Sequence, residues 1–367
     1  MDRRQISWWN SIMIHAQDRP NIAQTPVGSV FALQRRPKVA DVAARAGVST
    51  ATVDRVINGR GGVHQKTVAR VEEAIRAIAA AERPDELSAR ANLRFDAVLS
   101  GDGSEVTKSL AEALVGAGEA VSAQVDVAFV ETMNPEALAA CLRACAKRGT
   151  SGIAVQVLDH AIVREAIEEL LRADIPVVTV LTDMAGVHRL AYVGLDNRAA
   201  GRTSGFLMVR FCRGAGKLAI VWGGQLYRSH EERESGFRSI VRAERPDLQC
   251  LELITGNDNP TVTRVGVRAA IARHPDLVGI YCVGGGIAGA AEAIEEAGLA
   301  QSLVMIGHNC NADTKPYLLS GTIQAVVHQD IARIAETALR CLSTRTSLPL
   351  NTGIPIEIVT RENLMYR

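Results

Sequence analysis

One stretch near the start of the chain places polar side chains at a spacing suited to reading DNA bases. From residue 49 to residue 58, Ser, Thr, Arg and Asn alternate with apolar residues at helical intervals. On a helix in the major groove, arginine can pair with guanine and a small apolar side chain can contact the thymine methyl. We expect DNA contacts from Val39, Ser49, Thr50, Ala51, Thr52, Asp54, Arg55, Asn58 and Thr67.

Apolar spacing around this stretch predicts two short helices joined by a tight turn. Val39, Val42 and Ala46 recur at helical intervals, Gly47 interrupts them, and Ser49 can cap a second helix. Glycine permits the positive φ that ends the first helix sharply. A third amphipathic run from 63 to 78 can close a small core. The pattern predicts a helix-turn-helix, and the alternative is a helical hairpin within another kind of domain.

The local charge favours DNA as the partner of this region. Residues 35–83 contain ten Lys or Arg and five Asp or Glu, whereas the whole chain has a net charge of only +1. A surface that neutralises phosphates needs such an asymmetry. We therefore predict a DNA-binding domain, against the alternative of a solvated basic face.

These residues resemble the headpiece of the lactose-repressor (LacI) family. The family pattern D-V-A-x-x-A-G-V-S-x-x-T-V-S-R-V-x-N, followed by V-x-x-x-T-x-x-x-V, is matched from Asp41 to Asn58 and then at Val63, Thr67 and Val71. The resemblance implies a homodimeric transcriptional regulator with a small-molecule-binding domain behind the headpiece. It also implies that the second helix lies in the major groove of a palindromic double-stranded operator.

Two positions depart from the family pattern and bear on the operator. Asp54 stands where the family most often has Ser, and its carboxylate repels phosphate unless it pairs with Arg55 or accepts from a cytosine amino group. Thr50 and Ala51 match the family's base-reading pair, and both are short. They suit contact with a thymine methyl, or they are simple helix surface. Arg55 is then the stronger base reader, through O6 and N7 of guanine.

The segments that flank the headpiece carry weaker signals. The family's hinge, P-N-x-x-A-x-x-L, is matched poorly by residues 83–93, where Asp85 replaces Asn and Ala91 stands at the Leu position. Leu87 or Leu93 can supply a minor-groove wedge, and a solvated linker is the open alternative. Residues 1–35 lack a signal-peptide core, so we expect a disordered extension or a product of start-site choice. The expected domains are 36–82 for DNA binding and 94–367 for ligand binding.

Beyond residue 94, short apolar runs alternate with amphipathic segments. This alternation predicts parallel sheets covered by helices on both faces. The expected strands are 95–99, 125–129, 152–157, 176–181, 190–193, 217–221, 250–254, 277–283 and 303–307. The length favours two Rossmann-like lobes, with the chain crossing between them near 196–202 and again near 307–311.

This second half resembles the periplasmic sugar-binding-protein domain of the LacI family. The expected fold class is therefore α/β, a small all-α helix-turn-helix domain followed by two Rossmann-like lobes of the periplasmic binding protein type I kind. Ligands of such folds bind at the carboxyl ends of the strands. The candidate ligand residues there are Asp102, Asp159, Asp183, Asp196, Trp222, Tyr227, Arg233, Asn309 and Gln329.

Each of these polar residues has a competing structural explanation. Carboxylates and amides at strand ends suit a hydroxyl-rich ligand, but they also cap helices and satisfy turns. Core packing is the default for Trp222. The resemblance implies a ligand role for Arg233, in an R-x-x-G-aromatic element, and for the strand-end Gln329. Gly284-Gly285-Gly286 replaces the family's Asn-Asp, and Asn309 replaces an Asp, which removes charge and argues against a standard hexose.

Several function classes find no support in the sequence. It contains no G-x-S-x-G, Walker or kinase motif, and the glycine-rich turn at 284–286 lacks the acidic ribose ligand of a dinucleotide-binding site, so we expect no enzyme and no cofactor. The histidines lack metal-ligand spacing. Seven cysteines and no run of membrane-spanning length favour the cytoplasm and no membrane partner. We expect a ligand-responsive regulator, more readily a repressor, that senses a sugar, polyol or related polar metabolite. The alternative is a solute-binding protein of a transport system.

Overall fold

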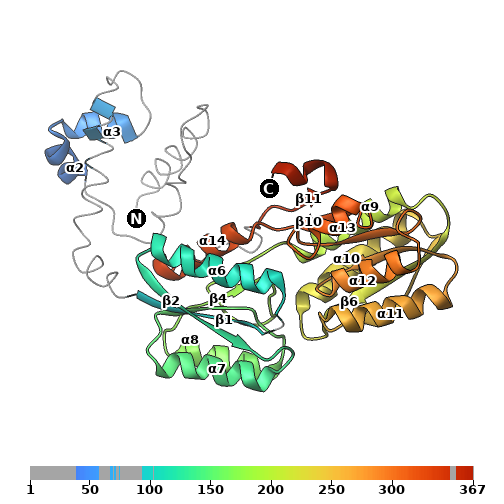
Figure 1. Ribbon diagram of the computed structural model, residues 1–367. Helices are drawn as coiled ribbons and strands as arrows, with labels where there is room; N and C mark the ends of the chain where they lie inside the picture. The colour runs from blue at the N-terminus through green and yellow to red at the C-terminus, as the bar shows by residue number, and fades with distance from the viewer. Residues whose placement is uncertain are drawn as a thin grey trace. The chain divides into compact units, whose positions relative to one another are not determined.

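The computed structural model describes residues 39–57, 67–68, 70–71, 74, 93–101, 103–347 and 353–366 (Figure 1). The chain divides into two units, 1–89 and 90–367, and each is described by itself. The expected extension 1–35 and the linker up to residue 92 lie outside the described residues. Within the described part, no helix is long and apolar enough to cross a membrane.

The N-terminal unit contains the expected pair of short helices. Helix α2 (Val39–Ala46) and helix α3 (Thr50–Ile57) are joined at Gly47, whose φ is +62°. The Oγ of Ser49 accepts a hydrogen bond of 3.2 Å from the backbone N–H of Thr52, as an N-cap does. The expected helix-turn-helix geometry is confirmed.

A small apolar core closes this unit. The buried side chains come from α2, α3 and the helical residues after 67; they are Val42, Ala43, Ala46, Val53, Val71 and Ala74. Arg70 adds a polar link, because its guanidinium donates to the carbonyl oxygens of Ala46 at 2.5 Å and Gly47 at 3.3 Å. A cation at the end of α2 satisfies carbonyl groups that have no partner within the helix.

The first lobe is a five-stranded parallel sheet in the order β2-β1-β3-β4-β5. Its strands are β1 (Leu93–Ser100), β2 (Ala123–Val130), β3 (Gly152–Val155), β4 (Val177–Val180) and β5 (Ala191–Val193). Helices α6 (Glu105–Ala120) and α14 (Ile331–Thr344) cover one face; α7 (Pro135–Lys147) and α8 (Ala161–Arg172) cover the other (Figure 1). Every residue of β3 and β4 is buried, as expected for a sheet covered on both faces.

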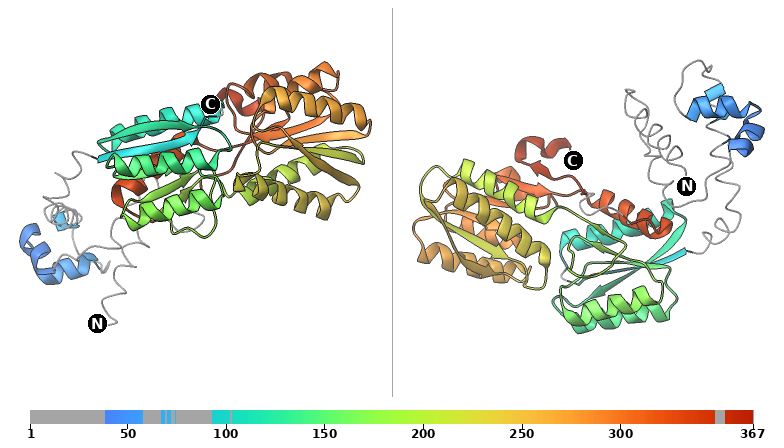
Figure 2. Two further views of the ribbon diagram at one scale, coloured as in Figure 1. Left: turned by 90° about the horizontal axis from the view of Figure 1, so that it is seen from below. Right: turned by 180° about the vertical axis from the view of Figure 1, so that it is seen from behind.

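The second lobe is a six-stranded sheet in the order β11-β10-β9-β8-β6-β7. Its strands are β6 (Gly216–Trp222), β7 (Leu248–Thr255), β8 (Leu277–Cys282), β9 (Val304–His308), β10 (Ala325–His328) and β11 (Glu357–Val359). Helices α9 (Asn197–Phe211) and α10 (Arg228–Glu244) share one apolar core with the sheet, and α11 (Pro260–Arg273) and α12 (Ile287–Glu296) share the other (Figure 2). The short helix α13 (Lys315–Ser320) precedes β10, and the 3-10 helix η2 (Arg361–Tyr366) follows β11.

All nine expected strands are present, but β10 was not among the expected strands, and neither was the three-residue β11. It pairs antiparallel with β10, with Val326 opposite Val359, at the edge of the second sheet. A strand of three or four residues is too short for its alternating pattern to be distinguished from that of a loop. The expectation of two α/β lobes is confirmed.

The first expected crossing between lobes, near 196–202, is close to the observed one. The second expected crossing, near 307–311, is wrong. The chain crosses between Val193 of β5 and Asn197 of α9. Near 307–311 it stays in the second lobe, because β9 and β10 pair in parallel with Ala325 opposite Ile306. It crosses after β10 into α14, whose apolar face packs in the core of the first lobe, and returns to β11. An amphipathic helix pattern does not specify which of two sheets the helix covers.

Helices α9 and α10 approach each other more closely than side chains would allow. A Cβ added at Gly201 would lie 1.9 Å from the carbonyl oxygen of Arg233, and one at Gly236 would lie 2.3 Å from that of Arg198. Glycine is therefore required at both crossing positions for steric reasons. This contact fixes the first turns of the two helices, where Asn197 and Arg233 lie.

We predict that Gly201→Ala destabilises the protein by about 1–3 kcal/mol, because the added methyl forces the backbones of α9 and α10 apart. The matched control is Gly116→Ala in α6, where an added Cβ meets no atom within 4 Å. That change should stabilise the helix by about 0.5–1 kcal/mol. Urea unfolding measures both variants, and equal midpoints for Gly201→Ala and the unsubstituted protein would contradict the close contact.

Candidate functional site

Helix α3 buries one side and presents the other to solvent. Val53 is fully buried, whereas Thr50, Ala51 and Arg55 are exposed. Thr52 is half-buried, and its Oγ1 lies 2.9 Å from the Oγ of Ser49. The guanidinium of Arg55 has no hydrogen bond or ion pair with any described residue. The exposed face can therefore present Arg55 to another molecule.

The remaining predicted DNA contacts are less well defined. Thr67 is half-buried in the last helical segment of the N-terminal unit. Val39 and Asp54 lie in α2 and α3, but their side chains are outside the described residues, as is Asn58. The structure thus places Thr50, Ala51 and Arg55 on one accessible helix face and leaves the role of Asp54 a prediction.

Two of the predicted carboxylates already have partners within the protein. Asp159 forms a 3.0 Å ion pair with Arg164, and its backbone N–H donates to the carbonyl of Leu226 at 2.9 Å. Asp196 is the N-cap of α9 and accepts from the backbone N–H of Ala199 at 2.9 Å. Asp102 lies outside the described residues. Capping and ion pairing are the interactions observed for Asp159 and Asp196.

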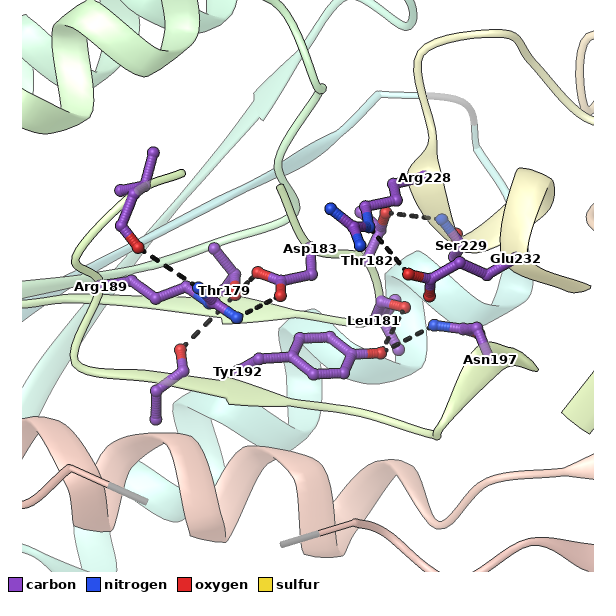
Figure 3. Close-up of polar contacts among 12 residues, drawn as sticks. Thr179, Leu181, Thr182, Asp183, Arg189, Tyr192, Asn197, Arg228, Ser229 and Glu232 are labelled. Carbon is purple, nitrogen blue, oxygen red and sulfur yellow. Dashed lines mark hydrogen bonds and ion pairs between the residues drawn. The ribbon is translucent and has the colours of Figure 1, made fainter. Parts of the chain in front are cut away.

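Asp183 belongs to a polar cluster beside β4 and β5 (Figure 3). Its carboxylate accepts a 2.8 Å hydrogen bond from the hydroxyl of Thr179 and forms an ion pair with Arg189. Burial raises the pKa of Asp183, and the charge of Arg189 acts in the opposite direction. The carboxylate is therefore partly shielded from water and is already paired within the first lobe.

Separate polar contacts lie near this cluster, at the chain crossing and the start of α10 (Figure 3). The backbone N–H of Ser229 donates to the hydroxyl of Thr182 at 3.3 Å. The side-chain amide of Asn197 donates to the hydroxyl of Tyr192 at 2.9 Å. Arg228 pairs with Glu232 at 2.8 Å. Polar groups of both lobes therefore meet where the chain first crosses between them.

A cavity of about 360 Å³ adjoins these contacts. Its walls come from the first lobe, the crossing segment and the start of α10, and its lining residues are Asp183, Val187, His188, Arg189, Leu190, Ala191, Tyr192, Leu195, Asp196, Asn197, Arg198, Arg228 and Glu232. Since both lobes contribute, the shape of this cavity depends on the lobe arrangement.

In the second lobe, Arg233 is a buried cation held by neutral acceptors. The residue is 4% exposed; its Nε donates to the Oδ1 of Asn197 at 2.8 Å and its Nη1 to the carbonyl of Val283 at 2.8 Å. Burial lowers the pKa of Arg233, although an arginine stays charged at neutral pH. Among the described residues, no carboxylate lies within ion-pair distance of this guanidinium.

Several buried polar atoms around Arg233 lack a hydrogen-bond partner in the described part of the chain. They are the Nε1 of Trp222, the Nδ1 of His230, the Nδ1 of His308 and the Oε1 of Gln329. Burial, with the nearby charge of Arg233, lowers the pKa of His230 to about 3 and that of His308 well below its usual value. Both imidazoles are therefore neutral at pH 7. Unpaired buried polar groups are costly and call for a functional explanation.

The other predicted residues of the second lobe lie at or near the same strand ends. The amide of Gln329 donates to the Oδ1 of Asn309 at 3.2 Å, and Asn309 has a φ of +65°. Trp222 is half-buried against the core beneath α9 and α10. Tyr227 is buried in the core of the first lobe, and its ring meets His230 edge-on at 5.2 Å. The loop between β6 and α10 thus reaches across to the first lobe.

The structure brings Trp222, Arg233, Asn309 and Gln329 to one end of the second sheet. It adds two residues that were not among the predicted ligand contacts, His230 and His308, and it adds Asn197, a strand-end candidate that follows the predicted Asp196. The strand-end position of Asn197 was a usable signal, but the preceding Asp196 has the more familiar capping role. The two histidines were considered only as metal ligands, and their burial is not evident from the sequence.

Comparison with known proteins identifies both parts of the chain. Residues 38–79 match the family described as bacterial regulatory proteins, lacI family, and residues 95–344 match a periplasmic binding protein domain. The chain belongs to the LacI family of bacterial regulators. It joins a DNA-binding headpiece to a domain of the sugar-binding-protein fold, as the sequence patterns predicted.

Individual relatives of this LacI-family chain are sugar-binding proteins. The D-ribose/D-allose-binding protein of Pseudomonas aeruginosa is 27% identical over 177 residues, which cover 46% of this chain and 55% of that relative. The glucose-galactose binding protein GanP of Geobacillus stearothermophilus has a TM-score of 0.69 and 23% identity, covering 74% of this chain and 99% of that structure.

A second similar structure supports the same fold. A solute-binding protein of Burkholderia graminis, solved in complex with D-arabinose, has a TM-score of 0.70 at 20% identity, covering 76% of this chain and 98% of the other. At such low identity the structural likeness establishes the two-lobed fold, while the ligand of this chain depends on its own residues.

The buried histidine beside Arg233 should make stability depend on pH. The folded pKa of His230, about 3, lies below its ordinary value of 6.5, so between these values only the unfolded chain binds the proton. Stability therefore falls as pH drops below about 6.5, by about 1.4 kcal/mol per pH unit for this imidazole.

Urea unfolding at pH 7.5 and 5.5 tests this dependence. We expect His230→Gln to lose less stability than the unsubstituted protein over that interval. His188→Gln, at an exposed position, serves as the control and should keep the original slope. An unchanged pH slope in His230→Gln would contradict a buried neutral His230.

Proposed function

We propose that this protein is a transcriptional repressor that binds a palindromic operator as a homodimer and responds to a small polar ligand. The observation that carries the proposal is the union, in one chain, of a lacI-family headpiece with a sugar-binding-protein fold. Repression and the dimeric state are assigned on the family resemblance. Dimers of this kind place their reading helices in half-sites one helical turn apart.

On the DNA side, the exposed face of α3 is the reading surface. Arg55 is its strongest candidate, because a guanidinium can form two hydrogen bonds to guanine. Thr50 and Ala51 are exposed beside it and suit contact with a thymine methyl. The basic excess around the headpiece supports affinity for the phosphates.

On the ligand side, we place the effector at the carboxyl ends of the second sheet, around Arg233, Asn197 and Gln329. Buried polar atoms without partners support this choice, since a bound ligand can supply the missing hydrogen bonds. The relatives bind ribose or allose, glucose or galactose, and arabinose. We infer a hydroxyl-rich metabolite of sugar or polyol type.

Regulation requires that the ligand bind two lobe arrangements with different affinities. Groups from both lobes meet at the first chain crossing, where Ser229 contacts Thr182. A ligand at the strand ends can therefore bias the lobe arrangement and, through a dimer, the spacing of the two headpieces. The sign of the response, release or recruitment of DNA, follows from which arrangement fits the operator.

We predict that Arg55→Ala weakens operator binding by about 1–3 kcal/mol and relaxes base preference at one position of each half-site. Selection from randomised DNA, followed by gel-shift titration, measures both effects. Arg242→Ala, at an exposed position late in α10, is the control and should bind as the unsubstituted protein does. Selection of the same sequence by Arg55→Ala would refute this base contact.

The competing function is that of a solute-binding protein in transport, which the sugar-binding relatives favour. It leaves the headpiece without a role. A gel shift of the full chain on its own upstream DNA distinguishes the two functions, because specific binding should weaken steeply as salt rises. A chain that binds sugars but gives no salt-sensitive, sequence-specific complex would support the transport function instead.

A further inference from the structure

We propose that the ligand of this cleft carries an anionic group, a carboxylate or a phosphate, that pairs with Arg233. The proposal rests on the ligand site proposed above and specifies the chemical class of its occupant. A neutral sugar would satisfy hydrogen bonds but would leave the buried charge without a counter-ion.

No described carboxylate forms an ion pair with Arg233, and Asp258 and Glu232 act on its charge only from beyond that distance. The side chain is held between the amide oxygen of Asn197 and the carbonyl of Val283, which are both neutral. Its Nη2 makes no hydrogen bond with any described residue. A buried cation without an anionic partner is unfavourable, and a bound carboxylate or phosphate can engage a guanidinium through two parallel hydrogen bonds.

The described carboxylates around the cleft are already engaged elsewhere. Asp159 pairs with Arg164, Asp183 with Arg189 and Glu232 with Arg228, while Asp196 and Asp330 cap α9 and α14. Asp258 accepts a 2.6 Å hydrogen bond from the backbone N–H of Gly285. None of them lies within ion-pair distance of Arg233, so an anionic ligand would supply its direct ion-pair partner.

The glycines after β8 prevent an acidic side chain from entering this site. A Cβ at Gly284 would lie 2.6 Å from the ring of His230, and one at Gly285 would lie 2.9 Å from Asp258. The resemblance to the LacI family implies Asn-Asp at these positions. With glycine at these positions and the neutral Asn309 nearby, Asp258 is the carboxylate beside this turn, and it forms no ion pair with Arg233.

The unpaired groups near Arg233 also favour an acceptor-rich ligand. The indole N–H of Trp222 can only donate, and it is buried without a partner. The Nε2 of His308 lies 2.8 Å from the hydroxyl of Tyr281. If that hydroxyl donates, the unpartnered Nδ1 of His308 carries the proton and donates too. The unpartnered Oε1 of Gln329 can accept from a ligand hydroxyl, so the class is a polyhydroxylated acid or phosphate ester.

Matched ligand sets test the proposal on the full-length protein. Glucose is compared with gluconate, glucuronate and glucose 6-phosphate, and ribose with ribonate and ribose 5-phosphate, by calorimetric titration at constant ionic strength. Phosphate and sulfate are compared with chloride as simple anions by thermal unfolding. We expect at least one acid or ester to bind about tenfold or more tightly than its neutral parent. The acid and ester arms distinguish a carboxylate from a phosphate.

Substitution of Arg233 gives a second readout that does not require the natural ligand. Arg233→Met should abolish the preference for anions and raise the melting temperature of the ligand-free protein, because it removes a buried charge that has no ion-pair partner among the described residues. Arg233→Lys keeps the charge and should retain part of the preference. Arg242→Met, in the same helix but exposed, should change neither property.

Three outcomes would overturn the inference: neutral parents that bind as tightly as their acids, anion binding that survives Arg233→Met, or no response to any anion in the panel. Operator binding by the same samples is measured in parallel. If it persists while the anion preference fails, the proposed regulator stands and the ligand class is wrong. If sequence-specific DNA binding is absent, the proposed function fails whatever the ligand.

Discussion

The close approach of α9 and α10 at Gly201 and Gly236 is the constraint on which the ligand site depends. The backbone of Arg233 lies where a side chain at Gly201 would be, so the two helices fix each other's first turns. The same helix pair packs Phe237 against Tyr281, with ring centroids 4.4 Å apart and nearly parallel planes. Tyr281 in turn contacts His308. The packing of this apolar core thereby fixes the positions of the buried polar groups of Arg233 and His308.

The two lobes handle their polar strand ends differently. In the first lobe, the carboxylates of Asp159 and Asp183 are neutralised by neighbouring arginines. In the second lobe, Arg233 has only neutral acceptors, and several buried atoms around it have no partner among the described residues. Natural proteins leave buried charges and buried polar atoms without partners mainly where function requires it. This asymmetry supports the proposed placement of the ligand at the second lobe.

The sequence predicted those features that depend on local pattern. The turn at Gly47 and the cap at Ser49 follow from short-range geometry, and the buried strands follow from continuous apolar runs. Features that depend on tertiary choice were not predictable. The pattern of α14 is amphipathic, but nothing in it specifies that its apolar face covers the first sheet. His230 could not be recognised as a site residue, because its burial results from the packing of α10. Asn197 directly follows an aspartate whose capping role is evident from the sequence.

Asn197 provides a physical connection between ligand recognition and lobe arrangement. It begins α9 immediately after the chain crosses between lobes, and it is almost fully buried. Its Oδ1 accepts from Arg233 in the second lobe, while its Nδ2 donates to Tyr192 of β5 in the first. A change in the hydrogen bonding of Arg233 therefore acts directly on a residue that also holds the edge strand of the other lobe. The amide of Asn197 is buried, and both its oxygen and its nitrogen have hydrogen-bond partners. Breaking either bond would leave a buried polar atom without a partner, so the two lobes are coupled through this residue.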